Sequence, residues 1–371
     1  MRKLNFILLM IIAILSSSSL IIAQQDEVPP PRQWQVFVAD APEGGSDRLT
    51  FVDMLSGEIQ TSTISGGERY TTLADAVLYY DMRQARLMTV RPNTLPQPLT
   101  STPNPPNIRR INWAVSDDLT HLAWTLTTGD GGNLSTVTYV QQFNGEEAQI
   151  VFEDGPRNDG LRAMPVAFSP DNSQLYMDFQ PDGVADLTIF PQYARLFSVN
   201  IATGEIADLP GEPGCFCGAG FGAGWFLRLG LTPDGQDFDL YAVLLPDEAI
   251  TTIPAFRLRN FTQAGAIHIS PDGKKAVYAR VQFSGFGTEE ASAQTVLILA
   301  DLSTMTQEAL GQPIEEVVYP TGWTEDNTAV LISSKARSGT WKIHIQDGTL
   351  HRIATETYIG VITAPYTEDN Q

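Results

Sequence analysis

One four-residue phrase recurs through the chain and constrains its fold more than any other feature. Each copy has Ser or Thr first and Asp third: Ser116-Asp117-Asp118-Leu119, Ser169-Pro170-Asp171-Asn172, Thr232-Pro233-Asp234-Gly235, Ser270-Pro271-Asp272-Gly273 and Thr324-Glu325-Asp326-Asn327. A type I turn favours Ser at its first position, Pro at its second and Gly at its fourth, so the phrase predicts a structural reverse turn. Five copies along one chain indicate a repeated unit.

The residues before each turn alternate in size, as they would along one strand of a sheet. Directly before the turns stand Val115, Phe168, Leu231, Ile269 and Trp323, and two residues earlier stand Trp113, Val166, Leu229, Ile267 and Thr321. The column between them is small in four of five copies: Ala114, Ala167, Gly230, His268 and Gly322. Small residues are expected where inner strands crowd around an axis, with larger side chains packed between neighbouring sheets.

Tight hairpins are the second repeated device. They turn at Ser56-Gly57, Asn144-Gly145, Thr203-Gly204 and Asp347-Gly348, each between runs of alternating apolar residues. Glycine after a small polar residue supplies the positive φ that such turns need. Each unit therefore reads strand, turn, strand, loop, strand, hairpin and strand, which is one four-stranded propeller blade. Because no amphipathic helix of three turns appears, the sequence predicts an all-β propeller.

The spacing of the turns bears on blade number. The five turn aspartates are 53, 63, 38 and 54 residues apart, and residues 76–100 form a degenerate unit before them. We expect seven blades, with six as the alternative.

The two ends of the sequence predict how the ring closes. Residues 358–366 form an apolar strand, and Thr367-Glu368-Asp369-Asn370 after it has the form of the earlier turns. Residues 33–64 read as three strands with a hairpin at Ser56-Gly57. We predict that residues 358–366 supply the innermost strand of the blade that residues 33–64 begin, because this pairing covers edges that would otherwise stay open.

Three segments carry a family resemblance. They are residues 270–280 (SPDGKKAVYAR), 169–179 (SPDNSQLYMDF) and 196–209 (LFSVNIATGEIADL). They resemble the WD-like blade repeats of TolB-like propellers, which also occur in the propeller domain of prolyl oligopeptidases. The resemblance covers most of the chain after residue 32 and implies a propeller that interacts with proteins at the cell envelope. It names no reaction, because one fold hosts many functions.

The first 23 residues have the form of a secretory signal. Arg2 and Lys3 are basic, residues 6–15 are apolar, residues 16–19 are serines, and Ala23 fits the cleavage position. An uncleaved anchor is the alternative, although residues 6–22 are short for a span. No cysteine lies near the cleavage region, which disfavours a lipoprotein. We expect a proline-rich linker over residues 24–32 and one extracytoplasmic propeller domain over residues 33–371.

Net charge narrows the range of partners. The chain has 23 Lys and Arg against 43 Asp and Glu, a formal charge of −20, which becomes −22 if residues 1–23 and their two basic side chains are removed. An acidic surface repels phosphate, so the charge disfavours nucleic acids and anionic membranes as partners. It favours solubility, and it leaves cationic partners or Ca²⁺ open.

The sequence contains no recognisable catalytic motif. A serine hydrolase of the prolyl oligopeptidase kind would need a Gly-x-Ser-x-Gly elbow, and the nearest string, QFSGFG at residues 282–287, lacks the first glycine. The histidines, His121, His268, His344 and His351, show no metal-ligand spacing. His268 interrupts the small column and is a candidate to face the central channel. A hydrogen-bonded structural role for His268 is the favoured alternative.

Cys215 and Cys217 lie in a glycine-rich loop over residues 211–224. On an extended strand their Cα atoms would be about 6.6 Å apart, near the limit for a disulfide, so a strained bridge needs a turn. The sequence leaves the bridge and two separate thiols open, and metal ligation lacks two further ligands. The strings TGDGGN at 128–133 and DGVAD at 182–186 fit hairpin loops better than Ca²⁺ sites.

These observations favour an exported, monomeric, non-catalytic propeller that binds a protein, peptide or glycan at the cell envelope, with no cofactor and no metal. The alternative is a propeller enzyme of the lactonase, lyase or cyclotransferase kind with its site in the central channel. A channel lined by converging carboxylates and His268 would favour the enzyme, whereas a broad apolar patch on the rim would favour the binding protein.

Overall fold

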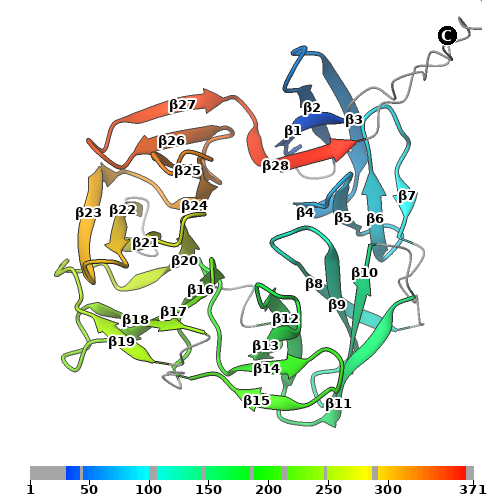
Figure 1. Ribbon diagram of the computed structural model, residues 1–371, viewed down its shortest axis with the longest axis horizontal. Coiled ribbons are helices and arrows are strands. Elements are labelled where there is room, and N and C mark those ends of the chain that lie inside the picture. The colour runs from blue at the N-terminus through cyan, green and yellow to red at the C-terminus, as the bar shows by residue number, and fades with distance from the viewer. Residues whose placement is uncertain are drawn as a thin grey trace, which may run out of the picture.

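The computed structural model describes residues 31–41, 45–99, 107–143, 147–183, 188–210, 215–245, 249–285 and 291–364. Within these ranges the chain forms 28 strands and no helix, and hence no apolar helix that could cross a membrane. The strands make seven four-stranded sheets arranged around a central axis (Figure 1). The predicted all-β propeller is therefore confirmed, with seven blades rather than six. The expected signal segment and residues 24–30 of the expected linker lie outside the described residues.

The first blade combines strands from both ends of the chain. From the axis outwards, it consists of β28 (Thr357–Ala364), β1 (Arg32–Ala39), β2 (Ser46–Asp53) and β3 (Ile59–Ser65). The second, third and fourth blades follow in chain order: β4 (Gly67–Thr72), β5 (Val77–Asp81), β6 (Arg86–Val90), β7 (Gln97–Pro98); β8 (Ile108–Val115), β9 (His121–Asp130), β10 (Asn133–Gln142), β11 (Gln149–Arg157); β12 (Leu161–Phe168), β13 (Gln174–Pro181), β14 (Leu196–Asn200), β15 (Ile206–Asp208).

The fifth, sixth and seventh blades complete the ring in the same order, innermost strand first: β16 (Ala219–Gly222), β17 (Trp225–Leu231), β18 (Phe238–Leu244), β19 (Ile250–Ile253); β20 (Gln263–Ile269), β21 (Lys275–Ser284), β22 (Ser292–Asp301), β23 (Thr306–Ile314); β24 (Val318–Trp323), β25 (Ala329–Ser334), β26 (Thr340–His344), β27 (Leu350–Ala354). Neighbouring strands within every blade are antiparallel.

The ring closes through the first blade. Strand β28 pairs antiparallel with β1, from Arg32 opposite Ala364 to Val38 opposite Thr357. The predicted closure is confirmed as far as Ala364, and residues 365–371 lie outside the described residues. Pairing β28 with β1 satisfies backbone groups of a strand that would otherwise expose an edge.

The repeated phrase forms the turn between the first and second strands of a blade. Ser270 Oγ donates to Asp272 Oδ1 at 2.7 Å, and the N–H of Lys274 donates to the same oxygen at 3.2 Å. The N–H of Gly273 donates to the carbonyl of Ser270 at 2.8 Å. The hydroxyl-to-carboxylate bond recurs in the copies that begin at Ser116, Ser169, Thr232 and Thr324. Each turn satisfies its own polar groups, which explains why these residue types recur.

Apolar clusters between neighbouring blades make the core. Six junctions hold one cluster each, beginning with Phe51 and Tyr79 between the first and second blades and ending with Leu297 and Ile332 between the sixth and seventh. The described residues form no such cluster at the remaining junction, between the seventh and first blades. One junction of the ring is therefore built differently from the other six.

Candidate functional site

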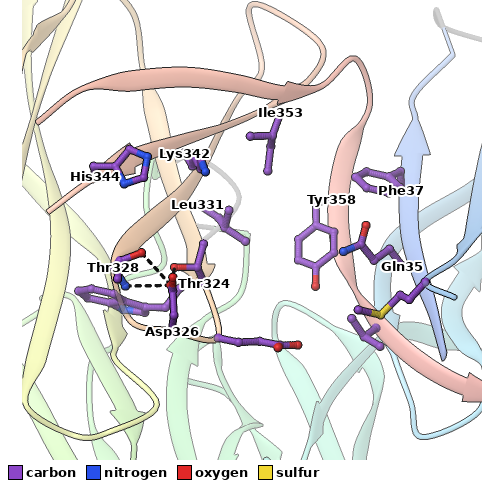
Figure 2. A pocket seen from close by; sticks show the side chains of 14 residues that line it. Gln35, Phe37, Thr324, Asp326, Thr328, Leu331, Lys342, His344, Ile353 and Tyr358 are labelled. Carbon is purple, nitrogen blue, oxygen red and sulfur yellow. Dashed lines mark hydrogen bonds between the residues drawn. The ribbon is translucent and has the colours of Figure 1, made fainter. Parts of the chain in front are cut away.

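The junction between the seventh and first blades holds a cleft of about 480 Å³. Figure 2 shows Leu331, Lys342 and His344 of the seventh blade on one side and Tyr358 of β28 on the other. The cleft is lined by Gln35, Phe37, Met54, Trp323, Thr324, Glu325, Asp326, Thr328, Leu331, Lys342, His344, Ile353, Tyr358 and Val361. Its volume is in the range of small-ligand sites.

The cleft has an apolar floor. Phe37 and Tyr358 are cross-strand partners on β1 and β28, with ring centroids 5.6 Å apart. Leu331 and Ile353 project from the opposite wall toward them (Figure 2). Ile353 is 48% exposed although it is large and apolar. Apolar side chains facing a hollow supply binding energy for an apolar group.

The alternation of β1 explains why this wall is not sealed. On one face of β1, Trp34, Val36 and Val38 are buried in the cluster shared with the second blade. The other face carries Gln33, Gln35 and Phe37. Two of these three side chains are amides that lose hydrogen bonds to water if they are packed against apolar residues. The face that meets the seventh blade is therefore half polar.

Ionisable side chains of both acidic and basic types line the cleft. Lys342 and His344 come from β26, and Glu325 comes from the turn between β24 and β25. Burial, and secondarily the charge of Glu325, raises the pKa of Tyr358. The Tyr358 hydroxyl therefore stays protonated at neutral pH and can donate a hydrogen bond.

Asp326 lines the cleft, and one of its carboxylate oxygens is engaged by its own turn. Its Oδ1 accepts hydrogen bonds from Thr324 Oγ1 at 2.7 Å, Thr328 Oγ1 at 2.8 Å and the N–H of Thr328 at 3.1 Å. These bonds, that of Thr324 foremost, lower the pKa of Asp326 to about 2. A carboxylate held ionised in this way is a poor proton donor near neutral pH.

Two further hollows share lining residues with the cleft. One, of about 490 Å³, is also lined by Phe37 and Ile353 and reaches Thr50 and Arg352. The other, of about 480 Å³, is also lined by Thr328 and His344 and reaches His351. The rings of His344 and His351 meet edge to face with centroids 5.7 Å apart. The cleft and the first of these hollows make a groove along the junction, and the second adjoins the groove on the seventh blade.

Hydrogen bonds fix the two walls at one end of the junction. Thr340 Oγ1 on β26 donates to the carbonyl of Glu356 at 2.8 Å and accepts the N–H of Tyr358 at 2.7 Å. Arg48 on β2 forms an ion pair with the Glu356 carboxylate. The walls are therefore joined beside the cleft rather than through it.

His268, the candidate for the channel, lies at the contact of two innermost strands. It stands on β20 and donates a hydrogen bond to the carbonyl of Pro320 on β24, and burial lowers its pKa to about 4. Its own carbonyl accepts the indole N–H of Trp323 at 3.1 Å. His268 does not line the cleft, and the structure does not bring it together with His344 and His351.

Cys215 and Cys217 are joined by a disulfide, with Cα atoms 5.4 Å apart. The bridge lies beside the buried Arg228, whose guanidinium donates to the carbonyls of Cys217 at 2.6 Å and Cys215 at 2.7 Å. Arg228 also donates to the carbonyl of Tyr193 at 2.8 Å. The arginine therefore fastens the disulfide loop to the loop of residues 188–195 in the fourth blade, which we name the fourth-blade loop.

The fourth-blade loop extends as far as the junction of the sixth and seventh blades. Phe190 is 1% exposed and belongs to the cluster between the sixth and seventh blades, with its ring centroid 5.6 Å from that of Tyr319. Gly265 on β20 gives it room, because a Cβ there would lie 2.5 Å from Phe190 Cβ. Tyr193 forms an isolated bridge with Cys217, and Gln192 Nε2 donates to the carbonyl of Ala264 at 3.0 Å, so the loop connects the fourth blade to the fifth, sixth and seventh blades.

The strings that could suggest Ca²⁺ sites have other roles. Residues 128–133 form the ends of β9 and β10 and the turn between them. Asp182, in the second string, pairs with Arg109 and Arg162, and residues 184–186 of that string lie outside the described residues. In the described part of the chain, no group of three His, Cys, Asp or Glu side chains is placed to hold a metal ion.

Comparison with known proteins identifies a shared architecture. No family model and no curated protein matches the chain. TolB from Acinetobacter baumannii is 13% identical and covers 89% of this chain and 82% of its own, with a TM-score of 0.43. A prolyl endopeptidase structure is 11% identical and covers 90% of this chain and 51% of its own, with a TM-score of 0.57. Likeness at these identities shows the propeller fold alone.

Proposed function

We propose that this protein is an extracytoplasmic, non-catalytic propeller that binds an extended peptide segment of a partner protein in the groove between its seventh and first blades. The observation that carries the proposal is the seventh junction, where a half-polar groove stands in place of the apolar cluster found at the other six. The signal-like N-terminus and the disulfide between Cys215 and Cys217 support the compartment.

The lining of the groove suits a peptide and disfavours a nucleic acid. The aromatic pair of Phe37 and Tyr358, with Ile353 opposite, suits an apolar side chain. Glu325 and Lys342, both of the seventh blade, suit a backbone or side chains that carry both donors and acceptors. A peptide offers these groups at alternating positions, whereas a phosphate backbone would need a uniformly basic groove.

Two observations support binding without catalysis. Asp326 is held ionised by three hydrogen bonds, so it is unsuited to proton transfer near neutral pH. His268, the residue expected to face the channel, donates its ring hydrogen bond to the carbonyl of Pro320 and is thereby engaged in the contact of β20 with β24.

A peptide-display screen followed by fluorescence anisotropy tests the proposal. Peptides selected on the wild-type protein should bind the Ile353→Glu variant at least about tenfold more weakly, because a charge replaces an apolar contact in the groove. Ile59→Glu is the matched control, since Ile59 is 64% exposed on the outermost strand of the first blade and lines no part of the groove. The proposal fails if no peptide is selected, or if selected peptides bind both variants equally.

A further inference from the structure

A second cavity, of about 350 Å³, lies between the second and third blades and is rich in cationic groups. It is lined by Glu68, Arg69, Tyr80, Arg109, Arg110 and Ile111. Three guanidinium groups thus face one carboxylate, in a protein whose formal charge is −20. The cavity is therefore locally positive and attracts anions, although the net charge of the protein repels them.

Arg69 is held in place by its surroundings. Its φ of +57° lies in the left-handed region, at an irregularity in the pairing of β4 with β5. One terminal nitrogen donates to the carbonyl of Ile111 at 2.7 Å, and the guanidinium carbon lies 4.3 Å from the centre of the Trp113 ring. A non-glycine residue in this conformation costs energy and persists where the structure around it requires it. The guanidinium is therefore oriented before any ligand arrives.

Arg109 is fixed by a residue of the fourth blade. Its Nε and one terminal nitrogen lie 2.7 Å and 2.6 Å from Asp182 Oδ2. The other oxygen of Asp182 lies 3.3 Å from Nε of Arg162, which is 1% exposed. Because Asp182 is shared by two arginines, it neutralises the charge of Arg109 only in part. The second, third and fourth blades together maintain the positive cavity.

We propose that this cavity binds a carboxylate group, either of a small organic acid or of the carboxyl terminus of a peptide. Guanidinium groups present paired N–H donors whose planar geometry matches a carboxylate. Burial raises the pKa of Tyr80, which keeps its hydroxyl protonated at the cavity wall. Glu68, on the same wall, opposes the entry of several negative charges and so favours a single carboxylate. The inference rests on different residues from those of the groove.

Isothermal titration of the whole protein at low salt tests the inference. The probes are propionate, acetyl-dialanine with a free carboxyl terminus, the same peptide as its amide, and inorganic sulfate. Wild-type protein should bind the free-acid peptide, and the amide should bind at least about tenfold more weakly, because hydrogen bonds to charged groups are the strong ones. Binding of propionate as well identifies free organic acids as ligands, and binding of the peptide acid alone identifies chain termini.

Three variants locate the site. Arg69→Gln and Arg110→Gln should each weaken binding of the acid by about tenfold or more. Arg195→Gln removes the same charge from an arginine that is 68% exposed on the fourth blade, and should stay within about twofold of wild type. Melting temperatures verify that each variant is folded, and Arg69→Lys, which keeps the charge but loses the planar fork, replaces Arg69→Gln if that variant does not fold.

Several results would overturn the inference: no binding of any carboxylate up to about 10 mM, equal binding of acid and amide, binding of sulfate alone, or equal loss in the Arg195→Gln control. Ile353→Glu should bind the acid like the wild-type protein. This variant separates failure at the cationic cavity from failure at the groove.

Discussion

The fourth residue of each repeated turn adopts a left-handed backbone. The φ values are +58° for Leu119, +56° for Asn172, +66° for Gly235, +67° for Gly273 and +57° for Asn327. Glycine and asparagine adopt this conformation readily, whereas in leucine the Cβ comes too close to the backbone and the conformation costs energy. One of five equivalent positions therefore carries a residue that its conformation disfavours.

Replacing Leu119 by asparagine should stabilise the protein. Leu119→Asn places at this turn the residue found in the equivalent positions Asn172 and Asn327, and we expect the free energy of unfolding to rise by about 0.5–1 kcal/mol. Urea unfolding measures the change. The reciprocal variant Asn327→Leu should lower the free energy of unfolding, and a rise there would contradict the backbone explanation.

His268 should make stability depend on pH. Its pKa is about 4 when folded against 6.5 in the unfolded chain, so between these values the unfolded state binds one proton that the folded state does not. The contribution is complete above about pH 6.5 and is lost as the pH falls toward 4. Urea unfolding between pH 7 and pH 4.5 gives the slope of the free energy of unfolding against pH. In His268→Ala this slope should correspond to about one proton fewer taken up on unfolding than in the wild-type protein. The exposed-residue variant His351→Ala should keep it.

Near its end, strand β28 buries the side chains of one face and exposes those of the other. Ile362 is 1% exposed and belongs to the cluster between the first and second blades, whereas Thr363 beside it is exposed. Alternate residues of a strand point to opposite faces, so one element seals a core and borders solvent. Its contribution to closure should depend on the buried face.

The variants Ile362→Ala and Thr363→Ala test this division. Ile362→Ala should cost about 2–4 kcal/mol in free energy of unfolding, because it removes buried methyl groups and leaves a cavity. Thr363→Ala should change the free energy by less than about 0.5 kcal/mol. Equal losses in chemical denaturation would mean that β28 stabilises the ring through its backbone alone.

The elements of the fold follow local patterns, which is why they could be predicted. The turn phrase, the hairpins and the pairing of residues 358–364 with residues 32–38 depend on short stretches whose alternation is visible in the sequence. The structure was needed to decide between seven blades and six, because the second blade lacks the phrase and has instead the Asp81 turn, which joins β5 to β6.

The groove could not be predicted, because its walls meet only when the ring closes. The lining residues between 323 and 353 supply one side and those between 35 and 54, with Tyr358 and Val361, the other, and nothing local shows that these faces fail to pack. The signal that was present is the pair Gln33 and Gln35 opposite an apolar face. The cationic cavity was equally hidden, since Arg69 adopts a backbone conformation that its residue type does not suggest.

At the scale of the whole molecule, the fourth-blade loop stabilises the ring in addition to the contacts between neighbouring blades. The fourth-blade loop is fastened at its base by Asp178, whose carboxylate accepts the N–H of Arg195 at 2.8 Å, and at its tip by Phe190 in the wall of the sixth and seventh blades. The seventh blade, which the tip of this loop contacts, also forms one wall of the hollow junction. The brace therefore supports the blades on one side of the groove.

Removing the tip of the brace should weaken the entire fold. Phe190→Ala deletes a buried aromatic side chain and should cost about 3–5 kcal/mol in free energy of unfolding. Phe216→Ala, at a position 39% exposed between the two cysteines, makes the same chemical change and should cost less than about 1 kcal/mol. Guanidinium unfolding compares them, and similar losses would show that Phe190 does not brace the ring.

The position of β28 also determines where the backbone crosses between blades. Every junction is bridged by a connection from the outermost strand of one blade to the innermost strand of the next, and the hollow junction is bridged by the segment from β27 to β28. A circular permutant that linked Ala364 to Arg32 and opened the chain between β27 and β28 would make every blade one continuous segment. Its hollow junction would keep only side-chain and hydrogen-bond contacts, such as those of Thr340 with Glu356 and Tyr358. In the natural connectivity, covalent continuity reinforces the junction at which the described residues form no apolar cluster.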